Sequence, residues 1–469
     1  MSLVSLALRN LLRNRRRSIA TLLAVGIGSA AILLFGGYSS NIKYTLQTVY
    51  VRGGGHLQVQ NREFFLYGSG DPTSYGIADY ELLLNTIRND GVLRGMLYAM
   101  TPMLQFGGIA GNYAAGVSRT VIGKGLVAGE YARMQQWNGA DILLPAPPFA
   151  LEGSAPDAVV VGTGVARVLE LCSALKVPNC RQRKSSPVSD GAPMPDDIAQ
   201  LSSQEASSEP SERPAIRETR GHRIELLASS AKGTPNVASV DVVRAETQSF
   251  KEMDEVTLVA HLAQAQQLVY GKSPPKVTAL MLQLRDSDDT RVAQARIESL
   301  LRNIKGGESL AVLNYETLNP YYVQTLELFD TIFGFILVLI GGIVLVNVGS
   351  TMNAAVVERT VEIGTLRAIG MRRAGIRRLF VLEGLFLGVA GAFVGAIGAL
   401  VAAFIVNRAG LTWLPPGVVD PVPLALRVWG EPHILIGTSV GLIVIATLSA
   451  CWPAHRAAQM VVVDALRHV

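Results

Sequence analysis

The sequence predicts an α-helical membrane protein with four transmembrane helices, arranged as one plus three, and a large α/β extracytoplasmic domain. Only 17% of the residues are charged, whereas soluble domains carry about 25%. Four apolar runs are each long enough to cross a bilayer, which takes about 18 residues or more. Between the first and second runs lie residues 43–324, enough for one large or two small domains. Together these observations define the fold class.

Residues 1–17 predict a short cytoplasmic amphipathic helix that lies at the membrane interface. Its leucines alternate with arginines and asparagines, and it ends in the arginines of residues 15–17, a pattern suited to an anionic membrane face. Residues 18–42 then carry no charge. A cleavable signal peptide has an apolar region of only about 7–15 residues, so we interpret this run as a retained first transmembrane helix.

The predicted extracytoplasmic domain, residues 43–324, mixes strand-like and helix-like patterns. The strand candidates are residues 55–60, 158–161 and 277–284, and the helix candidates are residues 80–88, 162–170 and 289–301. Residues 181–222 differ, because they have no Phe, Tyr or Trp and few large apolar residues. Such a segment buries too little surface to repay its ordering entropy. We interpret it as a disordered insertion, either passive or regulatory.

The order of the remaining segments follows from charge and hydropathy. Residues 325–357 form the end of a stalk and the second transmembrane helix, residues 384–407 the third and residues 434–454 the fourth. The arginine-rich connector, residues 358–383, is predicted to be cytoplasmic because short basic loops are retained there. The tail, residues 455–469, is then cytoplasmic, and residues 408–433 form an external loop. Residues 39–51 and 315–329 extend two of these helices as a hypothetical stalk that couples membrane motion to the external domain.

The connector contains a candidate coupling helix. Its apolar residues have helical spacing and its charged residues are expected to be exposed. The apolar residues are Val361, Ile363, Leu366 and Ile369, and the charged residues are Arg359, Glu362 and Arg367. Such a helix docks in a groove on a cytoplasmic partner or lies on the membrane surface without one. Spacing alone leaves both interpretations open.

The third predicted transmembrane helix carries small residues suited to close helix packing. They are Gly384, Gly388, Gly391 and Gly395, followed by Gly398 and Ala399. A smooth face of this kind lets helix backbones approach closely in lipid, either within one chain or between chains. Glu383, at the start of the helix, is interpreted as an interfacial residue in preference to a proton carrier.

A search for catalytic, metal and cofactor motifs gives no candidate residues. Gly271, Lys272 and Ser273 resemble the end of a phosphate-binding loop, but the earlier glycine is missing and two prolines follow. Hydrolase, zinc-protease and kinase motifs are also missing, and the cysteines lack metal-ligand spacing. Cys172 and Cys180 are either a disulfide or two free thiols. We therefore expect a non-catalytic chain that binds no cofactor, and its clustered positive charge indicates membrane topology, not nucleic-acid binding.

Three separated blocks of the sequence resemble one family. They are residues 7–17, residues 358–370 with Arg373 and Glu383, and residues 452–458 with 464–467. In these blocks the chain resembles the permease subunits of FtsX-like, MacB-type (type VII) ABC transporters. Residues 55–60 and 101–107 look most like the lipoprotein-releasing branch of that family, the LolC and LolE type.

The resemblance implies a multi-pass protein of the bacterial inner membrane with a MacB-like periplasmic core domain. It implies two copies of a cytoplasmic ABC ATPase subunit, which would hold ATP and Mg, and a second permease chain, the same or related. ATP-driven motion would pass through the stalk, by mechanotransmission, to extract lipoprotein or lipid cargo. The residues assigned to ATPase contact are Glu362, Ile363, Leu366, Arg367 and Ile369, with Arg359 and Arg373 at the membrane edge.

The rival interpretation is a signalling or scaffold protein of the same topology. It would move a periplasmic partner, such as a cell-wall hydrolase, without carrying cargo. A secondary transporter is disfavoured, since it would need more helices and charged residues near the membrane midplane.

Overall fold

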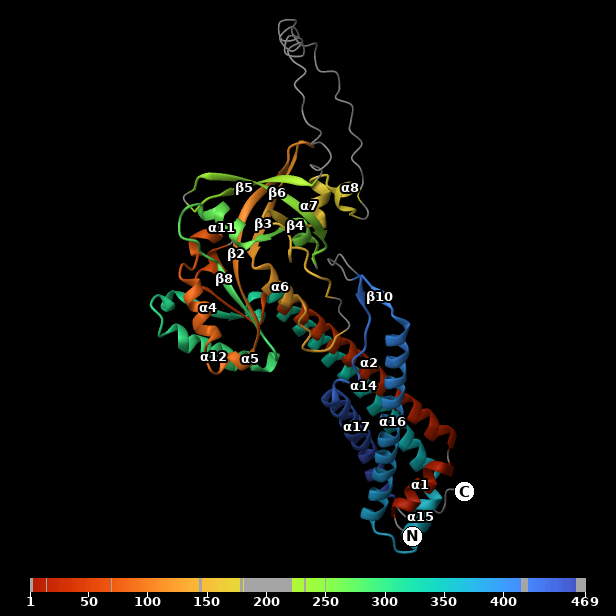
Figure 1. The fold of residues 1–469 in the computed structure, drawn as a ribbon. Helices are drawn as coiled ribbons and strands as arrows, with labels where there is room; N and C mark the ends of the chain where they lie inside the picture. The colour runs from red at the N-terminus through yellow and green to blue at the C-terminus, as the bar shows by residue number, and fades with distance from the viewer. Residues whose placement is uncertain are drawn as a thin grey trace, which may run out of the picture.

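The protein consists of a sheet domain joined to a bundle of long helices (Figure 1). The computed structural model describes residues 3–13, 15–68, 70–142, 146–177, 180, 222–231, 233–248, 250–414 and 421–460. The predicted insertion at 181–222 therefore lies outside the described residues except for its last residue, as does most of the predicted tail.

Four helices of the described chain are long and apolar enough to cross a membrane, as the sequence predicts. They are α2 (Arg15–Gly54), α14 (Pro320–Glu358), α16 (Arg373–Ala409) and α17 (Pro432–Gln459). α16 packs against α2 and α17, and α14 packs against the same two helices from another side. Their shared core includes Val25, Val348, Leu387 and Ala446, one from each helix. This confirms the predicted combination of four membrane helices with an α/β region between the first and second.

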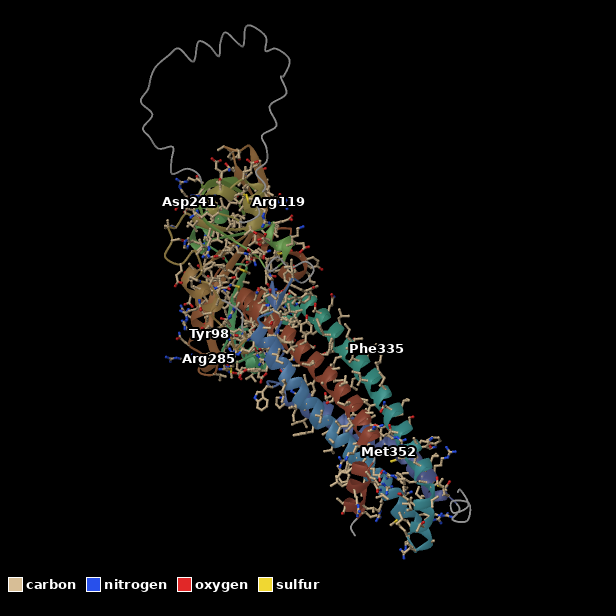
Figure 2. The ribbon with its side chains drawn as sticks, turned by 90° about the vertical axis from the view of Figure 1, so that its right-hand side faces the viewer. Tyr98, Arg119, Asp241, Arg285, Phe335 and Met352 are labelled. Atoms are coloured by element: carbon tan, nitrogen blue, oxygen red, sulfur yellow. A yellow bond between two sulfur atoms is a disulfide. The ribbon has the colours of Figure 1, made fainter. Side chains whose placement is uncertain are left out.

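α2 and α14 are much longer than a membrane span. They contain 40 and 39 residues, or about 60 Å each at 1.5 Å per residue, twice the roughly 30 Å of a hydrocarbon core. Figure 2, in which Phe335 and Met352 mark α14, shows both helices running along the bundle to the sheet domain. Each is therefore one continuous helix between the two ends of the molecule.

In the described part of the chain, the sheet domain has nine strands in the spatial order β3-β7-β4-β6-β5-β2-β8-β1-β9, with an additional β3–β2 pairing. The strands are β1 (Leu57–Asn61), β2 (Leu97–Asn112), β3 (Val117–Leu126), β4 (Ala158–Gly162), β5 (Arg223–Ser229), β6 (Pro235–Glu246), β7 (Thr257–His261), β8 (Ala279–Leu284) and β9 (Leu310–Asn314). Because the long strand β2 pairs with β3, β5 and β8 at once, six strands close into a ring and β8-β1-β9 continue from it. Among the strand pairs of the described residues, only β3–β7 and β4–β6 are parallel.

Short helices cover this sheet and complete its core. They are α3 (Phe64–Tyr67), α4 (Tyr80–Arg88), α5 (Leu93–Met96), α6 (Ala128–Gln135), α7 (Thr163–Val168), α8 (Cys172–Leu175), α10 (Lys251–Asp254), α11 (Leu262–Tyr270), α12 (Thr290–Leu301) and α13 (Tyr315–Leu318). The predicted strands correspond to β1, β4 and β8, and the predicted helices correspond to α4, α7 and α12. Alternating and helical apolar periodicity thus placed these elements correctly.

α2 enters the sheet domain through a tight glycine turn. Gly55 has a φ of 78°, and a Cβ on it would lie 2.6 Å from the carbonyl oxygen of Leu282, so no larger residue fits there. One turn earlier, the buried Arg52 donates from Nε to the carbonyl oxygen of Trp137 at 2.7 Å. The end of α2 is therefore held firmly against the sheet domain.

Candidate functional site at the distal end of the bundle

The candidate site lies at the end of the bundle away from the sheet domain, here called the distal end (Figure 1). The elements that meet there are α1 (Leu3–Arg13), α15 (Thr360–Ala368), the last turn of α14, the first turns of α16 and the last turns of α17. The predicted first and third transmembrane helices begin at residues 18 and 384. In the structure, α2 begins earlier, at Arg15 within the arginine run, and α16 begins earlier, at Arg373. The apolar run marks the membrane span, whereas arginine, a good helix former, extends the helix beyond it.

A buried ion pair holds this end together. Arg359 donates from Nη1 to Oε1 of Glu383 at 3.0 Å, and their side chains are only 6% and 1% exposed. Asn10 of α1 donates to the same carboxylate oxygen at 2.7 Å, while Arg359 donates from Nη2 to the backbone oxygen of Asn10 at 3.0 Å. Arg359 is therefore not exposed, contrary to expectation, and Glu383 is its buried counter-ion.

Exposed ion pairs surround this buried pair. Arg13 of α1 donates to both carboxylate oxygens of Glu362, the longer of the two hydrogen bonds being 2.7 Å. Arg17 donates from Nη1 to Oε2 of Glu358 at 2.7 Å. Since the side chains of Arg13 and Glu362 are about half exposed, each such pair stabilises little by itself. Their geometric effect is to tie the N-terminal helices to α14 and α15.

The predicted apolar stripe of α15 is divided between two environments. Ile363 is only 3% exposed and packs with Val356, Phe380 and Ala457, whereas Ile369 is 80% exposed. Leu366 is half-buried against the same cluster. The side chain of Ile363 therefore fills the core of this chain, and its assignment to partner contact stays a prediction.

A different face of α15 remains open. Val361, Thr365, Ala368 and Ile369 are all exposed, at the spacing i, i+4, i+7 and i+8 that a helix presents to a groove. Arg373 is exposed near it at the start of α16. By contrast, Arg367 is half-buried and donates from Nη1 to the backbone oxygen of Met460. The structure therefore leaves a small apolar surface with basic surroundings.

The glycines of α16 pack within the chain against two different helices. A Cβ on Gly384 or Gly388 would lie 2.5 or 2.9 Å from an alanine Cβ of α17. On Gly391 it would lie 2.6 Å from Val25 of α2, and on Gly395 2.5 Å from the backbone oxygen of Gly26. The four glycines thus allow α16 to pack closely between α17 and α2. These close contacts are made within one chain.

The two cysteines of the possible disulfide lie far from this end. Cys172 and Cys180 form a disulfide in the sheet domain, with Cα atoms 5.9 Å apart, and Cys451 is a free, exposed thiol on α17. Among the described residues, no group of three or more His, Cys, Asp and Glu side chains is arranged to hold a metal ion.

Comparisons with known proteins agree with this architecture. The family described as "FtsX-like permease C-terminal" matches residues 331–462, which include α15–α17 and most of α14. The lipoprotein-releasing system transmembrane protein LolC of Neisseria meningitidis is 27% identical over 263 residues, which are 53% of this chain and 61% of LolC. The macrolide export protein MacB of Neisseria gonorrhoeae is 26% identical over 230 residues, 48% of this chain and 33% of MacB.

An uncharacterised ABC transporter permease of Methanocaldococcus jannaschii is 21% identical over 248 residues, 48% of this chain and 57% of that protein. The matched segments thus span less than two thirds of the length of each of these relatives. The four candidate membrane helices, the sheet domain after the first and the matched C-terminal region agree with the similarity to transmembrane permeases. The chain is similar to the FtsX-like, MacB-type permeases of ABC transporters, and the family match covers residues 331–462.

Proposed function

We propose that this chain couples ATP hydrolysis in a separate cytoplasmic ATPase subunit to movement of an extracytoplasmic sheet domain. One observation carries the proposal: α2 and α14 are each continuous from the distal end to the sheet domain. A displacement of α15, which is tied to α1 by the Arg13–Glu362 ion pair and directly follows α14, would move stiff helices and not flexible loops. The arginine-rich distal end would face the cytoplasm of a bacterium, and both termini would lie there.

The ATPase would dock on the exposed face of α15. Two ATPase copies, which hold ATP and Mg, would serve a pair of permease chains, the same or related. In this proposal the chain itself performs no chemistry and binds no cofactor. Its exposed Val361 and Ile369 supply apolar contact, and Arg373 supplies charge at the rim.

The cargo would be a lipoprotein or another apolar molecule taken from the inner membrane. Support comes from the similarity to LolC, whose name describes a lipoprotein-releasing system. Similarity to MacB, named for macrolide export, also favours an apolar cargo.

The first test is purification of the full chain from its host in mild detergent, with mass spectrometry of the proteins and lipids that accompany it. We expect an ABC ATPase with a lipoprotein or lipid. An ATPase accompanied only by a periplasmic hydrolase would replace extraction by a regulatory relay. Recovery of no ATPase would contradict the proposal as a whole.

The second test places a charge on the open face of α15. Ile369→Asp should abolish recovery of the ATPase, because a desolvated charge opposes apolar contact, while Ile369→Leu should retain it. Val292→Asp on α12, which is also exposed, controls for added surface charge. Full ATPase recovery with Ile369→Asp would remove α15 from the proposed interface.

A further inference from the structure

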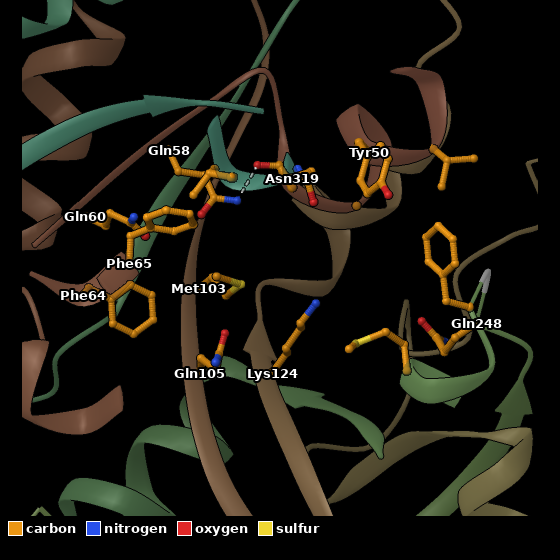
Figure 3. A pocket seen from close by; sticks show the side chains of 16 residues that line it. Tyr50, Gln58, Gln60, Phe64, Phe65, Met103, Gln105, Lys124, Gln248 and Asn319 are labelled. Atoms are coloured by element: carbon orange, nitrogen blue, oxygen red, sulfur yellow. Dashed lines mark hydrogen bonds between the residues drawn. The ribbon is translucent and has the colours of Figure 1, made fainter. Parts of the chain in front are cut away.

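A cavity lies where α2, the sheet and the segment before α14 meet (Figure 3). Its volume is about 430 Å³, within the range of roughly 300–1,000 Å³ typical of small-molecule sites. Tyr50 and Gly54 of α2 form one wall, Asn319 before α14 forms another, and β1–β3 form the base. An occupant would therefore contact both long helices and the sheet.

One cation points into this cavity. Lys124 of β3 is half-buried, and Figure 3 shows its ammonium group extending between Met103 and Tyr50. Among the described residues it has no hydrogen-bond or ion-pair partner, and no Asp or Glu is among those lining the cavity. Burial lowers the pKa of Lys124, because no anion compensates for its lost hydration.

A buried amide on another strand that lines the cavity also lacks a partner. Gln60 of β1 is 1% exposed, and its Nε2 has no acceptor among the described residues. Gln105 of β2 lies next to Lys124 in Figure 3. Buried polar groups are normally hydrogen-bonded, so a cation and an unpaired donor lining one cavity indicate an acceptor that comes from outside the chain.

Apolar side chains provide much of the remaining wall. Phe64 and Phe65 of α3, Met103 of β2 and Phe250 all line the cavity. Aromatic rings and methionine accommodate hydrocarbon of varied shape. A single cation with an apolar surround matches an amphiphile that has one negative head group.

We propose that this cavity binds a small amphiphile with one anionic head group, a carboxylate or a phosphate. Lys124 pairs with the head group, and the aromatic residues cover the hydrocarbon part. The inference goes beyond the proposed function and does not depend on it, because binding here requires neither an ATPase nor transport.

The first experiment follows Lys124 directly. The full chain in lipid nanodiscs is treated with an amine-acylating reagent, and the modification rate of Lys124 is measured by peptide mass spectrometry. Octanoate or octyl phosphate should slow modification severalfold, while octanol should not. Protection by octanoate alone identifies a free carboxylate, and protection by octyl phosphate alone identifies a lipid-like phosphate. Equal protection by octanol, or no protection at all, would overturn the proposal.

A matched pair of variants provides the second experiment. Lys124→Met keeps the aliphatic stem, and Lys272→Met changes a lysine that is exposed on a turn. Titration calorimetry with the protecting anion should show binding weakened about tenfold to a hundredfold in Lys124→Met, the loss expected for one charge-assisted hydrogen bond. Lys272→Met should bind normally. Equal affinity in both variants would exclude Lys124 as the anion receptor.

Discussion

At the residue scale, the buried pair of Arg359 and Glu383 shows how strongly context decides a charge's role. Both side chains stand in a sequence rich in exposed arginines, yet both are enclosed among three helices. Arg359 Nε has no partner among the described residues. A buried pair offers little net stability over an apolar pair, but losing one member leaves a costly buried charge.

We predict that Arg359→Met destabilises the bundle by about 3–5 kcal/mol. The double variant Arg359→Met/Glu383→Leu should recover most of this loss, because no unpaired charge remains. Thermal unfolding in detergent measures both effects. Arg13→Ala, which breaks an exposed ion pair, should cost at most about 1 kcal/mol of stability. If Arg359→Met cost no more than Arg13→Ala, burial of the Arg359–Glu383 pair would not be what makes it important for stability.

A second prediction at this scale concerns His56 and the pH dependence of the protein's stability. Its Nδ1 accepts a hydrogen bond from the backbone N–H of Leu284 at 3.0 Å, so Nε2 carries the proton and donates to Ser287. Burial lowers the pKa of His56 from 6.5 to about 4. The unfolded chain therefore binds the proton at a higher pH than the folded chain. Stability is complete above about pH 6.5 and falls, by up to about 3 kcal/mol, as the pH decreases to about 4.

The measurement is the unfolding temperature of the full chain at pH 7.5 and pH 5. His56→Asn keeps an acceptor near the Nδ1 position and should reduce the pH dependence. His455→Asn, which changes an exposed histidine, should leave it unaltered. An identical pH profile for all three proteins would show that His56 does not titrate on unfolding.

At the element scale, α16 is positioned by where its small residues lie. Gly395 meets Ser29 and the backbone of Gly26, whereas Gly398 has no atom within 4 Å of its would-be Cβ. We predict that Gly395→Ala destabilises the bundle by about 1–3 kcal/mol, since α2 must move away. Gly398→Ala should be neutral or slightly stabilising, because alanine favours helix. We expect the thermal unfolding temperature to fall in Gly395→Ala and not in Gly398→Ala. An equal change in both variants would mean that α16 does not pack as described.

At the scale of the whole molecule, a buried cluster joins the bundle to the sheet domain. Its members are Val51 of α2, Trp137 after α6, Tyr315 of α13 and Tyr322 of α14. Tyr322 is 1% exposed, and Gln47 of α2 donates to the hydroxyl of Tyr315 at 3.1 Å. In the proposed function, this joint would carry a displacement of either long helix to the sheet domain.

We predict that Tyr322→Ala loosens this joint by leaving a large void in the cluster. Amide hydrogen exchange across the last turns of α2 should accelerate. Tyr321→Ala changes the adjacent residue, which is 55% exposed, and should leave exchange there unchanged. Similar amide exchange rates in the last turns of α2 in the two variants would show that this cluster does not hold the long helices against the sheet domain.

The fold class was predictable from sequence because membrane spans and alternating strands depend on local periodicity. Runs of apolar residues identified the four long helices, and short periodic segments identified β1, β4, β8, α4 and α12. The order of nine strands was not predictable, since β2 pairs with three partners far apart in the chain. Strand pairing depends on long-range contacts that no local pattern encodes.

By itself, the sequence determined the membrane class, the position of α15 and the resemblance of the chain to a known family. Hydropathy and motifs are properties of consecutive residues, so they can be read without a structure. Tertiary structure decided which face of that helix is free. Ile363 and Ile369 are the same residue type on one short segment, yet one fills the core and the other is exposed. The difference arises because α16 and α17 cover only one side of α15. Burial is set by neighbours distant in the chain, and those become known only when the helices are packed together.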